Sequence, residues 1–498
     1  MATKRSFPAP LTIIMIVIIL AAIATWFVPP GSYNRLSFEE DHFTLATQTS
    51  NISIPATQHT LDSLGINIAL KKLVDGDIRK PVAVPGSYYN QAKNGQGFIS
   101  IIQAPFKGMY DTTDIILFIL TIGGFISIFY ESGALEKGTK NLAVKMKGRE
   151  NSLVILFTFF FALGGSSYGM AEETLAFYPL LVPIFLAAGF DLLMPVAVIF
   201  LGSTIGNMAA VTCPFSVILA SDAAGINWSI GTIGRIVMFV VCTGITIIYL
   251  LRYSKQVKKD PSSSLVLKYD GAVALKFPAI DASESANMGT RDKLILILFG
   301  ATFCMLVYGV VVMGWWLLEM SALFFASALL LAVIMRMNEK VFVAKFIKGA
   351  EELLSVAFIV GFARGVTIVL NDGHISDSIL YYASQATGGM PSTLFIISIF
   401  ILFLILSIFI SSSSGMAVLT MPIIAPLGIM IGMDNQHIVN AYLFGMGITN
   451  IITPTGLVLP ALAMVNVSYK TWIRFVLPLM IILFIISVIY LLAGVLFF

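Results

Sequence analysis

A polar, doubly acidic segment interrupts an apolar part of the sequence. Residues 165–174 read Gly-Ser-Ser-Tyr-Gly-Met-Ala-Glu-Glu-Thr, and apolar runs flank them at 152–163 and 175–188. Carboxylates are costly in hydrocarbon surroundings, so membrane proteins retain them where they handle a solute, an ion or a proton. The segment therefore predicts a functional site within a membrane, around which the rest of the chain is arranged.

The composition of the whole chain agrees with a membrane-spanning protein. Of its 498 residues, 57% are hydrophobic and 11% are charged, whereas soluble domains carry about 25% charged residues. The net charge of +3 gives no indication of a nucleic-acid partner. The three cysteines and four histidines form no ligand or nucleophile pattern, so we expect neither an enzyme nor a bound cofactor.

Apolar runs and basic loops predict the order of the membrane elements. Short loops rich in Lys and Arg all fall on one side, which places the N-terminus in the cytoplasm and the C-terminus outside. We expect an N-terminal repeat at 1–259, with transmembrane helices at 10–28, 114–130 and 230–251, an outer loop at 29–113, a hairpin at 151–188 and a broken helix at 195–221. After a cytoplasmic linker at 260–292 we expect a C-terminal repeat at 293–498, with a hairpin at 392–432 and a broken helix at 437–465.

The charge rule does not decide whether the hairpins cross the membrane, because a hairpin returns to the side on which it began. The first arm has about 14 apolar residues, or roughly 21 Å at ~1.5 Å per residue. That length is short for a span of about 30 Å. We therefore expect re-entrant hairpins.

An internal repeat connects the two halves. Ser-Ser-Tyr-Gly-Met-Ala at 166–171 returns as Ser-Ser-Ser-Gly-Met-Ala at 412–417, and Gly-Phe-Asp at 189–191 returns as Gly-Met-Asp at 432–434. In both halves an asparagine follows that aspartate after 16 residues. The predicted topology gives the repeats opposite orientations. Inverted repeats with discontinuous helices are typical of secondary transporters.

Four longer segments resemble one transporter family. They are Trp-Phe-Val-Pro-Pro-Gly-Ser-Tyr at 26–33, Gly-Met-Ala-Glu-Glu-Thr-Leu-Ala-Phe-Tyr-Pro at 169–179, the basic segment 252–262, and Gly-Phe-Ala-Arg-Gly-Val-Thr at 361–367. They look like the YfcC branch of the C4-dicarboxylate anaerobic carrier (DcuC) family, within the ion transporter superfamily. The resemblance implies a helical scaffold with a moving transport domain, elevator-type transport, and substrates that are C4-dicarboxylates or basic amino acids. By analogy with elevator transporters we also expect a homodimer in a bacterial inner membrane.

The charged residues inside the apolar segments are the first site candidates. Glu172 and Glu173 follow the first hairpin tip, where they can recognise an amino or guanidinium group or carry a proton. Alternatively, they satisfy a helix dipole or pair with Arg364. Adjacent helical residues point about 100° apart, so we expect at most one of the two acids to face the ligand. Arg364 can bind a substrate carboxylate in a bidentate manner, or it is a structural ion-pair partner.

Polar residues at the tips and in the broken helices complete the expected substrate site. Their hydroxyl and amide groups can contact a solute, or they can cap free N–H groups. These candidates are Ser166, Ser167, Tyr168, Gly169, Ser412, Ser413, Ser414 and Gly415 at the tips, and Asn207, Thr212, Asn450, Thr453 and Thr455 in the broken helices. We expect a Na⁺ site, if Na⁺ is the coupling ion, near Ser167, Asn207, Ser413 and Asn450.

The sequence favours a secondary transporter of a small carboxylate-bearing solute. Two carboxylates beside the site suit a basic amino acid such as arginine or ornithine better than a dicarboxylate. The alternatives are a carrier of C4-dicarboxylates or other organic anions coupled to Na⁺ or H⁺, and a channel. As partners we expect the small-molecule substrate, the lipid bilayer and a second copy of the chain, and no nucleic acid.

Overall fold

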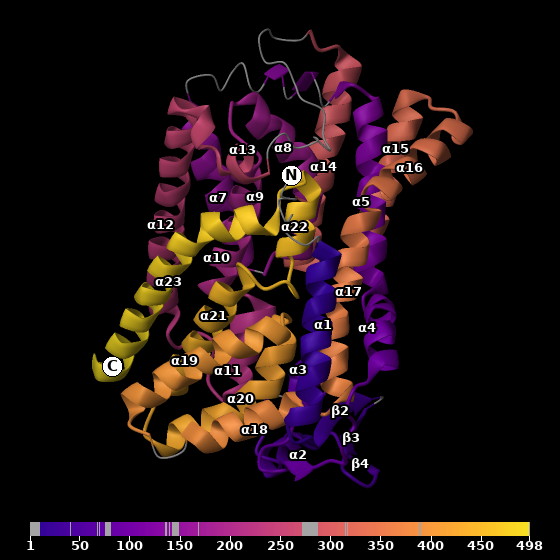
Figure 1. The fold of residues 1–498 in the computed structure, drawn as a ribbon. Helices are drawn as coiled ribbons and strands as arrows, with labels where there is room; N and C mark the ends of the chain where they lie inside the picture. The colour runs from indigo at the N-terminus through magenta and orange to yellow at the C-terminus, as the bar shows by residue number, and fades with distance from the viewer. Residues whose placement is uncertain are drawn as a thin grey trace, which may run out of the picture.

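Long apolar helices dominate the chain, which is shown here by a computed structural model (Figure 1). The structure describes residues 10–39, 41–66, 68, 70–74, 81–134, 137–138, 140–141, 149–167, 169–270, 287–313, 315, 317–387 and 390–497. Within these residues, seven helices are long and apolar enough to cross a membrane: α5 (Thr113–Glu131), α7 (Glu150–Ser167), α12 (Thr232–Lys259), α15 (Leu317–Met335), α17 (Leu354–Asp372), α19 (Ser392–Phe409) and α23 (Tyr469–Phe497). Large apolar side chains on their outer faces, such as Ile233 and Ile489, are exposed and available to lipid. The chain is a multi-pass membrane protein.

The expectation of an all-α chain is wrong in one place, because part of the segment 29–113, which we expect to be an outer loop, forms strands. A four-stranded antiparallel sheet has the order β4-β3-β2-β5, and β1 pairs with β6. In the sheet, Leu36 and Phe43 point inward and are buried, while Phe38 pairs with Phe43 across the strands. The elements of this segment are β1 (Gly31–Ser32), β2 (Arg35–Glu39), β3 (His42–Ala46), β4 (Asn51–Pro55), β5 (Val82–Ala83), β6 (Tyr89–Asn90), α2 (Gln58–Ser63) and α3 (Leu70–Val74).

Two parts of the chain run through the same order of helices. Each has two helices joined by a tight turn, then a hairpin, an interrupted helix and a long final helix. The first part is α4 (Phe98–Asp111), α5, α7, α8 (Tyr178–Ala187), α9 (Leu193–Val196), α10 (Gly202–Met208), α11 (Leu219–Ala223) and α12. The second is α16 (Glu339–Glu352), α17, α19, α20 (Ser413–Met430), α21 (Asn435–Asn450), α22 (Val458–Val465) and α23. Outside these sets lie α1 (Pro10–Phe27), α13 (Leu265–Tyr269), α14 (Thr290–Met313), α15, and α18 (Ser376–Thr387).

Glycines bring the paired helices of the two parts into backbone contact. A Cβ atom on Gly108 of α4 would lie 2.2 Å from the carbonyl oxygen of Gly361 and 2.7 Å from the nitrogen of Gly365, both in α17. In the same way, a Cβ on Gly349 of α16 would lie 2.2 Å from the carbonyl oxygen of Gly123 in α5. Small residues at such crossings allow membrane helices to approach closely. The close approach within the helix pairs α4–α17 and α5–α16 therefore depends on the absence of side chains at these glycines.

Each hairpin folds back on itself. Phe161 of α7 contacts Phe177 with ring centroids 5.1 Å apart, and Phe157 contacts Phe185 further from the tip. In the second hairpin, the Ser392 hydroxyl at the start of α19 donates to the carbonyl of Ile431. The helix α7 has 18 residues, so its length is about 27 Å. It is longer than expected because the helix also includes polar residues at both ends.

The broken helices are interrupted where backbone carbonyls are released. Residues 209–213 separate α10 from the π-helical turn Pro214–Ile218 that leads into α11, and residues 451–457 separate α21 from α22. Freed carbonyls in a membrane protein need internal partners. Trp472 of α23 donates its indole N–H to Ile451 at 2.9 Å, and the Tyr469 hydroxyl donates to Ile452. The α23 side chains therefore satisfy the second interruption.

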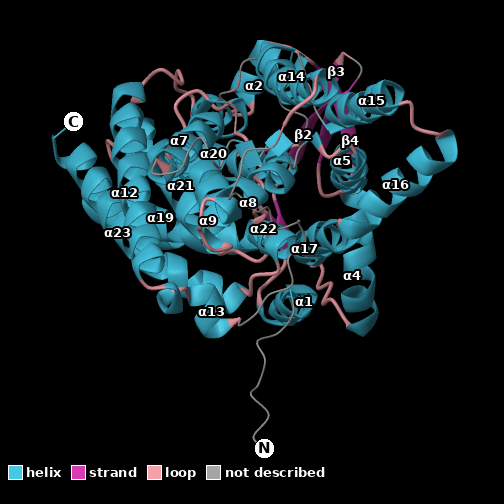
Figure 2. Cartoon of the chain, turned by 90° about the horizontal axis from the view of Figure 1, so that it is seen from above, coloured by secondary structure: helices cyan, strands magenta, loops and turns pink. Residues whose placement is uncertain are grey.

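The helices are arranged around the hairpins and the interrupted helices. In both views α12 and α23 lie along one side, while α4, α5, α15 and α16 lie along the other (Figures 1 and 2). The strands β2–β4 lie at the end of the molecule toward which α1 runs (Figure 1).

The start of the segment expected as a linker is held to the helices, whereas residues 271–286 lie outside the described part. The Ser264 hydroxyl and the Tyr253 hydroxyl donate to the Asp191 carboxylate at 2.7 and 2.5 Å. Asp191 lies in the loop between α8 and α9, and its burial raises the pKa of its carboxyl group.

Candidate functional site

A cavity of about 470 Å³ lies where both hairpin tips, both helix interruptions and the α4–α17 pair meet. Its charged lining consists of Asp111, Asp114, Glu172, Glu173 and Arg364. Its polar lining includes Ser203, Thr204, Asn207, Ser411, Ser412, Ser413, Ser414, Asn450 and Thr455. Residues that are distant in the sequence are therefore brought to one cavity of a size that suits a small solute.

The first tip turns sharply before its two acids. Gly169 has a φ of +83°, and its N–H donates to the carbonyl of Gly164 at 3.2 Å, which ends α7. A side chain there would be strained and would also meet the Cys213 sulfur. The next residues form the 3₁₀ helix Glu172–Phe177, so the turn delivers both acids to the cavity.

The two acids have different surroundings, although both line the cavity rather than only one of them. The Glu173 side chain is buried, and its Oε2 accepts the backbone N–H of Ala171 at 2.9 Å. Glu172 is half-buried, and among the described residues no other side chain hydrogen-bonds its carboxylate. Glu173 therefore helps to hold the tip, whereas Glu172 remains available to a ligand.

Arg364 does not pair with Glu172 or Glu173. It lies on α17 between Gly361 and Gly365, and its Nε donates to Oδ2 of Asp111. Asp111 is the last residue of α4, one turn beyond Gly108, so the glycine contact sets the two charged side chains side by side. Both side chains are partly exposed, by 46% for Asp111 and 28% for Arg364. Solvent therefore reaches the pair.

Two asparagines of the interrupted helices present acceptor oxygens. Asn207 and Asn450 line the cavity, and their Oδ1 atoms are buried without a hydrogen-bond partner in the described part of the chain. A buried unpaired acceptor is costly, which makes these oxygens candidates for a ligand donor or a cation. They occupy equivalent places in the two parts, each in the last turn of its helix before the interruption.

The second tip offers a helix N-terminus instead of acids. Ser412 caps α20, where its hydroxyl accepts the N–H of Gly415 at 3.2 Å. Ser413 and Ser414 form the first turn of this 18-residue helix and line the cavity. The positive end of the helix dipole suits a carboxylate group of a ligand.

Several expected site residues lie away from the central cavity. The Ser166 hydroxyl donates to Ala209 at 3.0 Å, the Ser167 hydroxyl to Leu163 at 2.7 Å, and the Thr212 hydroxyl to Ser167 at 3.0 Å. The Thr453 hydroxyl donates to Ile408 at 3.0 Å. The bonds of Ser166, Thr212 and Thr453 fasten each hairpin tip to the neighbouring interruption, whereas that of Ser167 stays within α7. Gly415 lines a different, outer cavity, and Tyr168 lies outside the described residues.

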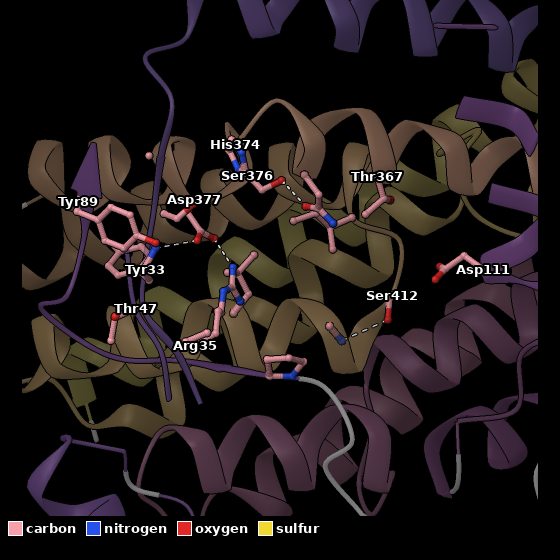
Figure 3. Close-up of a pocket in the computed structure, with 18 of the residues that line it drawn as sticks. Tyr33, Arg35, Thr47, Tyr89, Asp111, Thr367, His374, Ser376, Asp377 and Ser412 are labelled. Carbon is pink, nitrogen blue, oxygen red and sulfur yellow. Dashed lines mark hydrogen bonds and ion pairs between the residues drawn. The ribbon is translucent and has the colours of Figure 1, made fainter. Parts of the chain in front are cut away.

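The outer cavity, of about 590 Å³, is lined by residues of the strand segment, of α17 and α18, and of the second hairpin tip (Figure 3). Asp111, Arg364 and Ser412 line both cavities. At the far end from Asp111, Arg35 of β2 binds Asp377 at 2.6 Å, and the Tyr33 N–H donates to the same carboxylate (Figure 3). These contacts hold the strand segment against α18. The outer cavity, next to the strands, therefore adjoins the central cavity at the hairpin tips.

Sequence reasoning missed Asp111 and Asp114 as lining residues. They occur in the polar stretch Asp-Thr-Thr-Asp at 111–114, directly before an apolar run. The signal was present, because an aspartate at the last position of a helix opposes the dipole and needs a reason to be there. Only the contact with α17 shows that this stretch faces the cavity.

The chain resembles known proteins over almost its whole length. A model of the family described as "C4-dicarboxylate anaerobic carrier", DcuC, matches residues 7–496. A Haemophilus influenzae protein described only as uncharacterized is 37% identical over 480 residues, which cover 95% of this chain and 94% of that protein. An Escherichia coli protein, YfcC, provisionally named a basic amino acid antiporter, is 29% identical over 504 residues, which cover 97% and 96%.

Solved structures give weaker similarities. The Alcanivorax borkumensis transporter YdaH aligns with 97% of this chain and 98% of its own, at 13% identity and a TM-score of 0.40. The Neisseria gonorrhoeae protein MtrF, described as belonging to a class of antimetabolite efflux pumps, aligns with 99% and 96%, at 16% identity and the same TM-score. These scores are too low to establish a common fold. The match over residues 7–496 shows that this multi-pass membrane chain belongs to the C4-dicarboxylate anaerobic carrier (DcuC) family of transporters.

Proposed function

We propose that this protein is a secondary transporter that exchanges basic amino acids, such as arginine and ornithine, across a bacterial inner membrane. The observation that carries the proposal is the charge of the central cavity, where four carboxyl groups face one guanidinium group. A solute with a net positive charge compensates this excess, whereas a dicarboxylate would increase the repulsion. The provisional name of the Escherichia coli relative agrees with this choice.

The lining also offers a place for each end of a basic amino acid. The cationic side chain would lie against Glu172 and Asp114, which line the cavity and form no ion pair within the described part of the chain. The α-carboxylate would lie at the other side, between Arg364 and the N-terminus of α20. Two oppositely charged ends are thus bound without an unpaired charge being buried.

The arrangement of the helices supports alternating access of the elevator type. We infer inverted repeats, with re-entrant hairpins that move with the interrupted helices to which their tips are bonded. The glycine-packed helices α4, α5, α16 and α17 would form the stationary scaffold, and a homodimer would anchor it in the membrane. The basic loops support a cytoplasmic N-terminus and an outer C-terminus. In this orientation the strand segment is extracytoplasmic, and the outer cavity leads to the outside.

A coupling ion, if one is used, has a candidate site beside the substrate. The buried Oδ1 atoms of Asn207 and Asn450 and the Ser413 hydroxyl are neutral oxygens of the kind that Na⁺ accepts. Ser167 is a weaker candidate, because its hydroxyl already donates to Leu163. For a Na⁺-coupled protein, Asn450→Ala should raise the Na⁺ concentration that half-activates transport. Transport that is equal with Na⁺ and with choline would assign the coupling to H⁺ or to exchange alone.

The test is counterflow in proteoliposomes that contain the purified protein. Vesicles are loaded with unlabelled arginine, and the uptake of labelled arginine is followed with ornithine or succinate as competitor. We expect uptake that ornithine blocks and succinate does not. Uptake of labelled succinate that arginine leaves unchanged would instead identify a dicarboxylate carrier. Discrete current steps in a planar bilayer would identify a channel.

A further inference from the structure

The ion pair between Asp111 and Arg364 stands at the junction of the two cavities. Both residues line the outer and the central cavity, so a solute that moves between them passes this pair. The pair is partly exposed, so it is not a sealed structural contact. Exposed pairs of this kind contribute about 0–1 kcal/mol to stability. Stability alone therefore gives little reason for two charges at this place.

The contact leaves binding capacity on both partners. Arg364 uses Nε toward Asp111, and its two Nη groups donate no hydrogen bond within the described part of the chain. A guanidinium group has five donors, and its Nη edge can bind a carboxylate with two parallel hydrogen bonds. Asp111 uses Oδ2, so its Oδ1 remains free to accept from an ammonium group. An anion acceptor and a cation acceptor thus lie side by side.

We propose that Asp111 and Arg364 together form a clamp for the α-ammonium and α-carboxylate groups of an amino acid. The carboxylate binds the Nη edge of Arg364, and the ammonium binds Oδ1 of Asp111. This proposal rests on the proposed function, and it names Asp111 as the residue that selects α-amino acids. A dicarboxylate has no cation to offer Asp111 and meets like charge there.

The geometry also directs the remainder of the solute. The clamp holds the polar end of the amino acid at the junction, and its side chain extends into the central cavity toward Asp114 and Glu172. Selection of the α-amino group and selection of a basic side chain are therefore carried by different acids. The first can be removed without removing the second.

The experiment measures equilibrium binding to the purified full-length protein, with arginine and two analogues as probes. One analogue is Nα-acetylarginine, which lacks the ammonium charge, and the other is alanine, which lacks the basic side chain. In Asp111→Asn, arginine affinity should fall about ten- to a hundredfold, the usual effect of a lost charge-assisted hydrogen bond. The preference for arginine over Nα-acetylarginine should fall to about the same extent. Asp111→Glu should keep that preference.

Asp372→Asn is the matched control. Asp372 also joins α4 to α17 through an ion pair, with Lys107 at 2.7 Å, but it lines neither the outer nor the central cavity. Its substitution should leave both affinities within about twofold of the unsubstituted protein, a change below about 0.5 kcal/mol. An equal loss in Asp372→Asn would mean that bridging the two helices, and not the clamp, supports binding.

The outcomes separate the clamp from the proposed function. If the unsubstituted protein binds arginine but Asp111→Asn keeps its preference over Nα-acetylarginine, the clamp is wrong and the function stands. If the protein binds alanine more tightly than arginine, and Asp111→Asn lowers the affinity for alanine, the clamp stands and the proposal of a basic substrate is wrong. Binding of succinate with no binding of either amino acid would overturn both.

Discussion

Replacing Gly108 by alanine should displace the charged pair that lies one turn away. The added Cβ would lie 2.2 Å from the carbonyl oxygen of Gly361 and 2.7 Å from the nitrogen of Gly365. Carbon atoms rest at about 3.5–4.0 Å, so α4 and α17 must separate by about 1 Å. Both obstacles are backbone atoms of a helix, and no flexible side chain can move aside instead.

The two contributions to stability have opposite signs. Alanine is a better helix former than glycine by up to about 1 kcal/mol. Overpacking costs about 1–3 kcal/mol, so we expect a net loss of up to about 2 kcal/mol. For larger domains each kcal/mol lowers the melting temperature by about 2–4 °C. The separation also parts Asp111 from Arg364, and arginine affinity should fall at least about tenfold.

The assay is thermal unfolding in detergent together with arginine binding. Gly244 of α12 and Gly300 of α14 serve as controls, because a Cβ on either meets nothing within 4 Å. Gly244→Ala and Gly300→Ala should melt at or above the temperature of the unsubstituted protein and bind arginine normally. If Gly108→Ala melts and binds like these controls, the helices α4 and α17 are not joined through this glycine.

Three further variants test the acids. Glu172→Gln should lower the affinity for arginine about ten- to a hundredfold and leave the melting temperature unchanged. An unchanged affinity for arginine would show that Glu172 is not part of the site. Glu173→Ala should lower the unfolding free energy by about 1 kcal/mol, because the Ala171 N–H loses its acceptor. An unchanged melting temperature would show that this hydrogen bond does not contribute to stability. Burial raises the pKa of Asp191, so the folded protein holds this proton more tightly than the unfolded chain. Unfolding free energy should therefore fall as pH rises through the folded-state pKa. In Asp191→Asn the unfolding free energy should lack this part of its fall with pH. The prediction is contradicted if the melting temperatures of Asp191→Asn and of the unsubstituted protein change in parallel with pH.

The sequence predicts the membrane character and the family for a clear physical reason. A spanning helix must bury its backbone polar groups within itself, which leaves a long apolar run that can be read directly. The apolar run at 392–409, which forms α19, is such a segment. The family match confirms the resemblance found in the sequence motifs at 169–179 and 361–367. The strands at 31–90 were missed because each has only two to five residues, too few to show a clear alternation. Their alternation of apolar residues is weak beside the surrounding polar residues.

The sequence predicted several residues that line the cavity, but it did not predict which of them contact one another. Glu172, Arg364 and the serines near 412 do line the cavity. The partner of Arg364 was not predictable, because it depends on where α4 crosses α17. That crossing depends on the close backbone contact at Gly108, and a single glycine in the sequence does not indicate which helix it contacts. The hydroxyls of Ser166 and Thr453 were expected to contact a solute or to cap free N–H groups, and they donate to backbone carbonyls that only the folded tips bring within reach.

The unequal hairpin tips have a consequence for how such a protein can diversify. The second tip lines the cavity with hydroxyls and a helix N-terminus, groups whose chemistry suits a carboxylate without distinguishing one solute from another. The first tip alone carries acids, and they are adjacent in the chain. A change at Glu172 alone can therefore alter which charge suits the site, while the glycine contacts and the bond from the Ala171 N–H to Glu173 stay intact. In this architecture, new solutes can be explored at little risk to folding.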